Sequence, residues 1–99
     1  MPEHPLRMVE SLDPELFELV KTTNDLALSE GALPKKFKLL VAMALDAAVG
    51  TVAGVRSLAQ AAIRAGATKH EIMETLRVAQ YLCGVGSVYT AAEALKGLF

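Results

Sequence analysis

Residues 64–72 read Arg-Ala-Gly-Ala-Thr-Lys-His-Glu-Ile, and this stretch decides the fold of the chain. Gly66 stands where a helix ending near Ala65 needs a left-handed residue after its last turn. Thr68, followed three residues later by Glu71, forms a capping box in which each side chain bonds the other residue's backbone N–H. The stretch therefore predicts that one helix ends near Ala65 and that the next begins after Thr68.

Similar signals divide the rest of the chain into helices. Asp13-Pro14 is a cap followed by a helix-starting proline, Pro34 opens a second helix, and Gly50 ends it. Gly31 is expected to end the first helix, and Ser87 to cap the last one. No strand pattern appears. The predicted helices run roughly over 13–30, 34–49, 51–65, 69–83 and 87–95.

The spacing of apolar residues therefore predicts an all-α bundle of about five helices. The first helix carries one apolar face, whereas residues 39–48 are apolar nearly all round and are expected to be buried on most sides. Ninety-nine residues make a single domain, which we expect to span 13–99 after a loosely ordered segment 1–12.

Composition favours self-association. Hydrophobic residues make up 53% of the chain, more than one small domain hides easily, so we expect helices to pack between copies. A compact, alanine-rich monomer is the alternative. The net charge of −1, with mixed signs along the chain, argues against a nucleic-acid partner.

The chain is expected to lie in the cytoplasm. The apolar stretch 39–55 is interrupted by Asp46, Gly50 and Gly54, so a buried helical segment explains it better than a membrane span. No apolar run typical of a signal peptide follows the N-terminus. The single cysteine, Cys83, excludes a disulfide within the chain and suits a reducing compartment.

Asp46 is the most informative polar residue, because it places a carboxylate within an apolar run. Arg56 and Arg64, on the next predicted helix, are candidate partners. We favour a buried Asp–Arg pair that fixes how two helices meet. The alternative is a carboxylate that lines a cavity, has a shifted pKa and takes part in acid–base chemistry.

Cys83 is expected to be a packing residue. It falls on an apolar helical face near a helix C-terminus, where the helix dipole disfavours a thiolate. His4 and His70 are the only histidines, and neither has a second ligand one helical turn away. We therefore expect no metal and no cofactor.

Three stretches together resemble the carboxymuconolactone decarboxylase family, which includes the alkyl hydroperoxidase D-like proteins. They are LPKKFKLL at 33–40, RAGATKHEI at 64–72 and YTAAEAL at 89–95. The resemblance covers about two thirds of the chain and implies an all-helical subunit that forms homotrimers or homohexamers.

The hydroperoxidase branch of that family carries a Glu, a Cys-x-x-Cys and a His that this chain lacks. Anchored on residues 65–68, those positions fall on Leu39, Thr51, Gly54 and Leu58. The resemblance therefore supports the fold and argues against the thiol chemistry. Asp46 lies seven residues after Leu39, on nearly the same helix face, so we expect it to point toward the region of the redox centre in relatives.

Three functions remain open on the sequence alone. The first is an oligomer that binds a small molecule or serves as an accessory protein, without thiol peroxidase activity. The second is a lyase acting on a carboxylated lactone, with Asp46 and Arg56 as catalytic residues and Tyr81 or Tyr89 against the substrate, because an arginine fork matches a carboxylate. The third is residual peroxidase activity through Cys83 with an external reductant.

Overall fold

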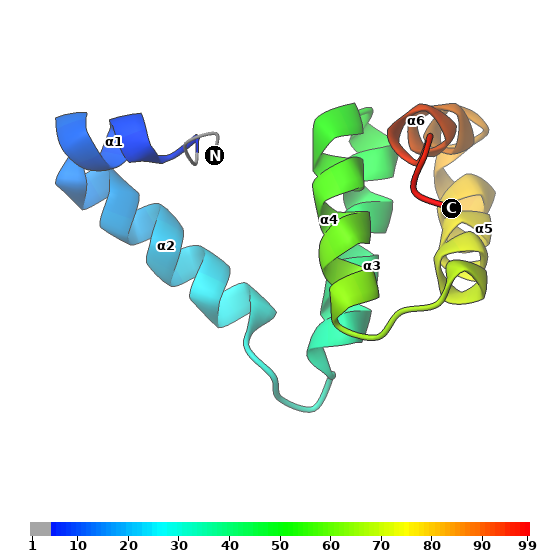
Figure 1. Cartoon of the computed structure of the whole chain (residues 1–99), viewed down its shortest axis with the longest axis horizontal. Coiled ribbons are helices and arrows are strands. Elements are labelled where there is room, and N and C mark those ends of the chain that lie inside the picture. Colours follow the sequence, from blue (N-terminus) through cyan, green and yellow to red (C-terminus); the bar gives the residue numbers. More distant parts are fainter. Residues whose placement is uncertain (1–4) are drawn as a thin grey trace.

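The computed structural model describes residues 5–99, which form six helices and no strand (Figure 1). His4 and the start of the segment 1–12 lie outside the described residues. The helices are α1 (Arg7–Leu12), α2 (Pro14–Leu28), α3 (Lys35–Val49), α4 (Val52–Arg64), α5 (Lys69–Cys83) and α6 (Gly86–Ala94).

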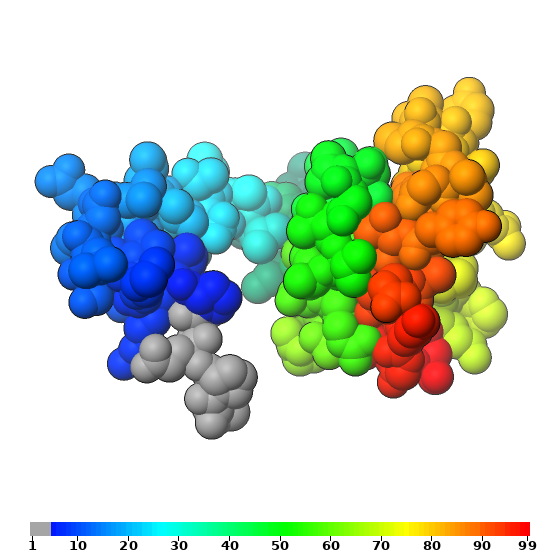
Figure 2. Space-filling view, turned by 90° about the horizontal axis from the view of Figure 1, so that it is seen from above, coloured from blue at the N-terminus to red at the C-terminus, as the bar shows by residue number. Residues whose placement is uncertain are grey.

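The helices divide into a body and an arm. Helices α3 to α6 pack on one another and form the body, residues 34–99, whereas α1 and α2 form an arm, residues 5–33, that leans away from it (Figure 1). The arm meets the body chiefly where α2 passes into α3. Seen from above, the arm is a separate lobe joined to the body by a narrow waist (Figure 2).

The core lies entirely in the body. Its fully buried side chains include Met43 of α3, Val55 of α4 and Ile72 of α5, with Ala91 and Ala94 of α6 closing one end. Alanines at the contacts let the helices approach closely. Neither α1 nor α2 has a buried residue.

The boundaries predicted from local signals are confirmed at four places. The Asp13 side chain accepts from the Leu16 backbone N–H at 3.1 Å, so it caps α2 as expected. Gly50 ends α3 as predicted, with φ of 85°, and Gly66 adopts φ of 103°, in the left-handed region predicted for it. Thr68 and Glu71 form both bonds of the capping box.

Other local predictions are corrected. Residues Arg7–Leu12 form α1, although no helix was expected before Asp13. Helix α2 ends at Leu28 with extended Ser29 after it, so Gly31 does not terminate it. Ser87 lies inside α6, which begins at Gly86, and does not cap the helix. Its hydroxyl instead donates to the Gly84 carbonyl at 2.7 Å.

Helix α3 is covered on one face only, against the expectation that it would be buried on most sides. Leu39, Leu40, Met43 and Ala47 face the core. The other apolar face is solvent-exposed in a single chain, and Leu45 is 63% exposed. Among residues 5–99 no helix combines the length and apolar character needed to cross a bilayer.

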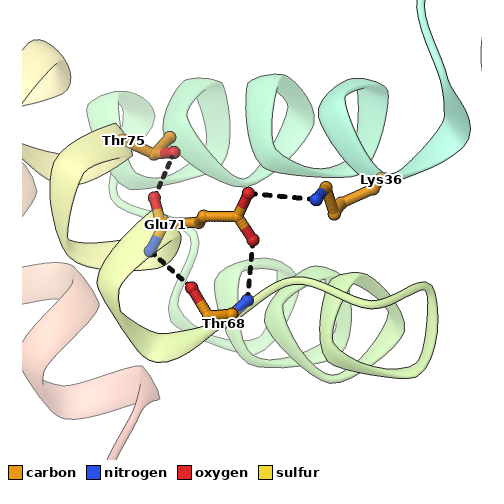
Figure 3. A network of polar contacts seen from close by, with 4 residues as sticks. All are labelled: Lys36, Thr68, Glu71 and Thr75. Atoms are coloured by element: carbon orange, nitrogen blue, oxygen red, sulfur yellow. Dashed lines mark hydrogen bonds and ion pairs between the residues drawn. The ribbon is translucent and has the colours of Figure 1, made fainter.

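A polar network ties the start of α5 to α3 (Figure 3). Glu71 accepts from the Thr68 backbone N–H at 2.9 Å and pairs with Lys36 of α3 at 3.0 Å, while Thr75 donates to the Glu71 carbonyl. The backbone hydrogen bond from Thr68 and the neighbouring Lys36 lower the pKa of the Glu71 carboxyl. The capping box thus also links two helices.

The lowered pKa predicts a pH dependence of stability. Because the folded-state pKa of Glu71 lies below the unfolded value of 4.5, its contribution is complete above that value and is lost as the pH falls through the folded pKa. Denaturation curves of wild type and Glu71→Gln should therefore differ near neutral pH and converge in strong acid. A difference in stability that persists undiminished in acid would contradict the lowered pKa of Glu71. Glu74→Gln, three residues later in α5, serves as the control.

Candidate functional site at the corner between helices α3 and α4

The corner between α3 and α4 places Asp46 beside the first turn of α4. Left-handed Gly50 ends α3, and the Thr51 backbone N–H donates to the Asp46 carbonyl at 2.9 Å. This tight closure leaves the Asp46 side chain one turn before the corner, half-buried. A carboxylate is favourable near a helix N-terminus, where the positive end of the dipole lies.

The Asp46 carboxylate lies against Gly54, in the first turn of α4. A Cβ atom added at Gly54 would lie 2.9 Å from Cγ of Asp46 and 3.0 Å from Cγ2 of Thr51, closer than carbon atoms normally approach. Glycine is thus what allows the carboxylate to reach the backbone of α4. This role of Gly54 was not predicted from the sequence, although an isolated glycine inside a helix is a signal of close approach.

Arg56 does not pair with Asp46. Its Nη1 donates to the Ala94 carbonyl at 2.9 Å and to the Lys96 carbonyl at 2.7 Å, so the guanidinium holds the C-terminal end of α6. Arg64, the other candidate, is exposed at the last turn of α4. Within residues 5–99 no ion pair involves Asp46. The expected buried Asp–Arg pair is therefore not formed.

The two tyrosines expected near a substrate lie on the surface of the chain. Tyr81 of α5 and Tyr89 of α6 are 81% and 73% exposed. No hydrogen bond joins either hydroxyl to Asp46 or Arg56 within the described part of the chain. A single copy thus brings together Asp46, Thr51 and Gly54, and leaves the tyrosines apart from them.

The comparisons with known proteins give one consistent assignment. The family model described as "Carboxymuconolactone decarboxylase family" matches residues 14–97. The chain belongs to the carboxymuconolactone decarboxylase family. The crystal structure of apo-lpg0406, a carboxymuconolactone decarboxylase family protein from Legionella pneumophila, is similar to it, with 36% sequence identity and a TM-score of 0.86. That match covers 92% of this chain and 81% of the other; no curated protein matches.

Membership of the carboxymuconolactone decarboxylase family and the all-helical fold confirm the resemblance read from the sequence. Of the four positions aligned with the redox motif, Leu39 is a core residue and Leu58 packs against the core. Thr51 and Gly54 lie at the α3–α4 corner, with the Asp46 carboxylate over Gly54. The Asp46 carboxylate therefore lies over Gly54, the position that the anchoring on residues 65–68 aligns with the second cysteine.

Cys83 is exposed, so its expected role as a packing residue is wrong. Ile72, Leu76 and Ala79 bring α5 onto the core, but the helix ends at Cys83 and Gly84 redirects the chain with φ of 86°. The last turn of α5 therefore runs past the end of the core. His70 is exposed in the first turn of α5, and no group of three potential metal ligands gathers among residues 5–99.

The contact between Asp46 and Gly54 predicts an energetic coupling. In an Asp46→Ala background, Gly54→Ala should stabilise the chain by at most about 0.5–1 kcal/mol, since alanine favours a helix over glycine but its Cβ still approaches Cγ2 of Thr51. With Asp46 present, that gain should vanish or reverse, because the carboxylate must move. Urea denaturation of the four chains in this double-mutant cycle measures the coupling. Equal effects of Gly54→Ala in both backgrounds would show that the two residues do not touch.

Proposed function

We propose that the chain is a small-molecule-binding member of its family that acts without thiol peroxidase chemistry. The observation that carries the proposal is the half-buried Asp46 carboxylate over Gly54, which has no ion pair within residues 5–99. A carboxylate held against a helix and left unpaired is available to a ligand at the α3–α4 corner.

The packing at Gly54 supports the absence of a two-cysteine cycle. A cysteine there would push its Cβ atom into Asp46, so the corner does not accommodate that residue without a shift of the carboxylate. Leu39 is buried in the core, and a glutamate at this position would place a carboxylate there at a cost in free energy. The one thiol of the chain, Cys83, lies on a different helix at its exposed end.

The chemistry of the corner favours a ligand that donates hydrogen bonds. An ionised carboxylate only accepts, so it suits a hydroxyl or amine group and repels an anion. The alternative function, a lyase acting on a carboxylated lactone, needs a cation for the substrate carboxylate. Arg56 would supply it only by releasing the carbonyls of Ala94 and Lys96.

Titration with small alcohols, amines and carboxylates, followed by the backbone amide signals of Thr51 and Gly54, tests the ligand class. We expect amines or alcohols to shift these signals in wild type, and the shifts to disappear in Asp46→Ala. If carboxylates alone shift them, and do so equally in Asp46→Ala, the lyase alternative gains support.

Hydroperoxide turnover tests the absence of thiol chemistry. With cumene hydroperoxide and dithiothreitol, we expect wild type and Cys83→Ser to consume no more peroxide than dithiothreitol alone. The reason is that Cys83 lies at the exposed end of α5, and the positions aligned with the glutamate and histidine of the redox motif are Leu39 and Leu58, which cannot relay protons. Turnover by wild type that is lost in Cys83→Ser would establish a one-cysteine peroxidase and overturn the proposal.

We further propose that the protein works in the cytoplasm as a homotrimer or homohexamer. A lone exposed thiol suits a reducing compartment, because in an oxidising one it would pair between chains. The apolar surface that a single chain leaves uncovered supports assembly from several copies.

A further inference from the structure

Most of the arm projects from the body of its own chain, which it meets at its C-terminal end, where Leu28 packs against the core and Lys38 donates to the Ser29 carbonyl. Helix α2 has no buried residue, and its apolar side chains Leu19 and Leu26 are 65% and 77% exposed. Within α2, Leu16, Leu19, Thr23 and Leu26 recur at spacings of three, four and three, the repeat of a seam that packs against another helix. Helices of this length are marginal in water without such packing.

The exposed area of the chain points to the same deficit. Its accessible surface is 6945 Å², whereas a compact monomer of 10.5 kDa exposes about 5,400 Å². The excess of about 1,500 Å² on one copy is about twice the area of about 800 Å² that one partner buries in a standard protein interface. The radius of gyration, 14.4 Å, likewise exceeds the value of about 13 Å for a compact chain of this length.

Charge is divided unequally between the two parts. In the arm, two basic residues stand against six acidic ones, a net charge of −4. In the body, eight basic residues stand against four acidic ones, a net charge of +4. Two arms packed together would therefore repel each other, whereas an arm and a body attract.

The body offers a matching apolar stripe on the uncovered face of α3. Val41, Leu45 and Val49 follow one another at intervals of four residues and are 54%, 63% and 76% exposed. Val41 and Leu45 also line a groove of about 320 Å³ with Leu28 and Leu33, at the junction of arm and body. Lys38 borders the same groove.

We propose that the arm of one copy packs its leucine seam onto the α3 stripe of a second copy. The acidic residues Glu15 and Glu18 beside the seam then come near the basic N-terminal end of α3, which includes Lys38. Exchange in this way covers both apolar surfaces at once and does not bring the acidic arms together. The inference does not depend on the ligand proposed for the α3–α4 corner.

Cross-linking between single-cysteine chains tests arm exchange. In a Cys83→Ser background, one chain carries Leu19→Cys on the arm and the other carries Leu45→Cys on the body. A short bismaleimide should link the mixed chains efficiently and link either chain alone only weakly. A chain with Phe99→Cys, an exposed position at the C-terminus and outside the α3 stripe, is the control and should not link to the arm.

Two further variants make the outcome decisive. Leu19→Glu and Leu45→Glu should each reduce the assembly to a 10.5 kDa monomer in light scattering, while Phe99→Glu should leave its mass unchanged. Since neither side chain is buried in the single chain, both variants should fold. Strong self-linking of Leu19→Cys would replace arm exchange by arm–arm pairing, and a monomeric wild type would reject any assembly.

Discussion

Replacing Ile72 by alanine is expected to lower the free energy of unfolding by about 2–5 kcal/mol. Ile72 of α5 is fully buried in the core of the body, where α5 packs on α3 and α6, so its removal leaves a cavity that the surrounding helices close only in part. Domains of this size have only about 5–15 kcal/mol of stability in total. The variant should therefore lose a large part of it, measured as a lower urea midpoint.

The neighbouring Met73 provides a matched control. It is 43% exposed on the same helix, and Met73→Ala should change the free energy of unfolding by no more than about 0.5 kcal/mol. Both variants are compared at one protein concentration, because association between copies adds to apparent stability. If Met73→Ala costs as much as Ile72→Ala, the face of α5 that meets the core has been assigned wrongly.

The sequence predicted those features that a few neighbouring residues decide. The cap at Asp13 depends on the next three residues, and the capping box on Thr68 and Glu71 alone. Gly50 and Gly66 stand where the backbone must turn left-handed, which few other residues do readily. Such signals do not require knowledge of how the helices pack, so they transfer directly from sequence to fold.

The partner of Asp46 could not be found in this way. Its helix and the next are adjacent in sequence, so an arginine on α4 was a reasonable partner, but one residue of a helix turns by about 100°. Gly54 faces Asp46, and Arg56, two residues later, points to the other side of α4 and toward α6. The glycine inside the helix was the overlooked signal of close approach.

Which face of α3 is buried could not be predicted from the sequence, for a different reason. Residues 39–48 are apolar nearly all round, and periodicity cannot say which face meets the core when every face is apolar. In the chain Met43 is buried whereas Leu45 is exposed, a difference set by the positions of α4, α5 and α6. The apolar residues of the exposed face are explained if another copy of the chain covers them.

Replacing Arg56 by methionine is expected to destabilise the chain by about 2–3 kcal/mol, because hydrogen bonds from a charged donor contribute about 1.5–3 kcal/mol. Its Nη1 reaches the carbonyls of Ala94 and Lys96 at the end of α6, where no intrahelical donor is available. Methionine keeps the apolar stem but removes both bonds. Chemical denaturation measures the loss, and hydrogen exchange should show earlier opening of the segment after Leu95.

Arg64 gives the comparison that separates structure from function. It lies exposed at the last turn of α4, so Arg64→Met should cost no more than about 0.5 kcal/mol. If Arg56→Met proves as stable as wild type yet abolishes the binding of a carboxylate, Arg56 is a substrate-binding residue and the lyase alternative is restored. If it is destabilised and the Asp46 corner still binds its ligand, Arg56 is a clamp that joins α4 to α6, and the polar chemistry of the corner rests on Asp46.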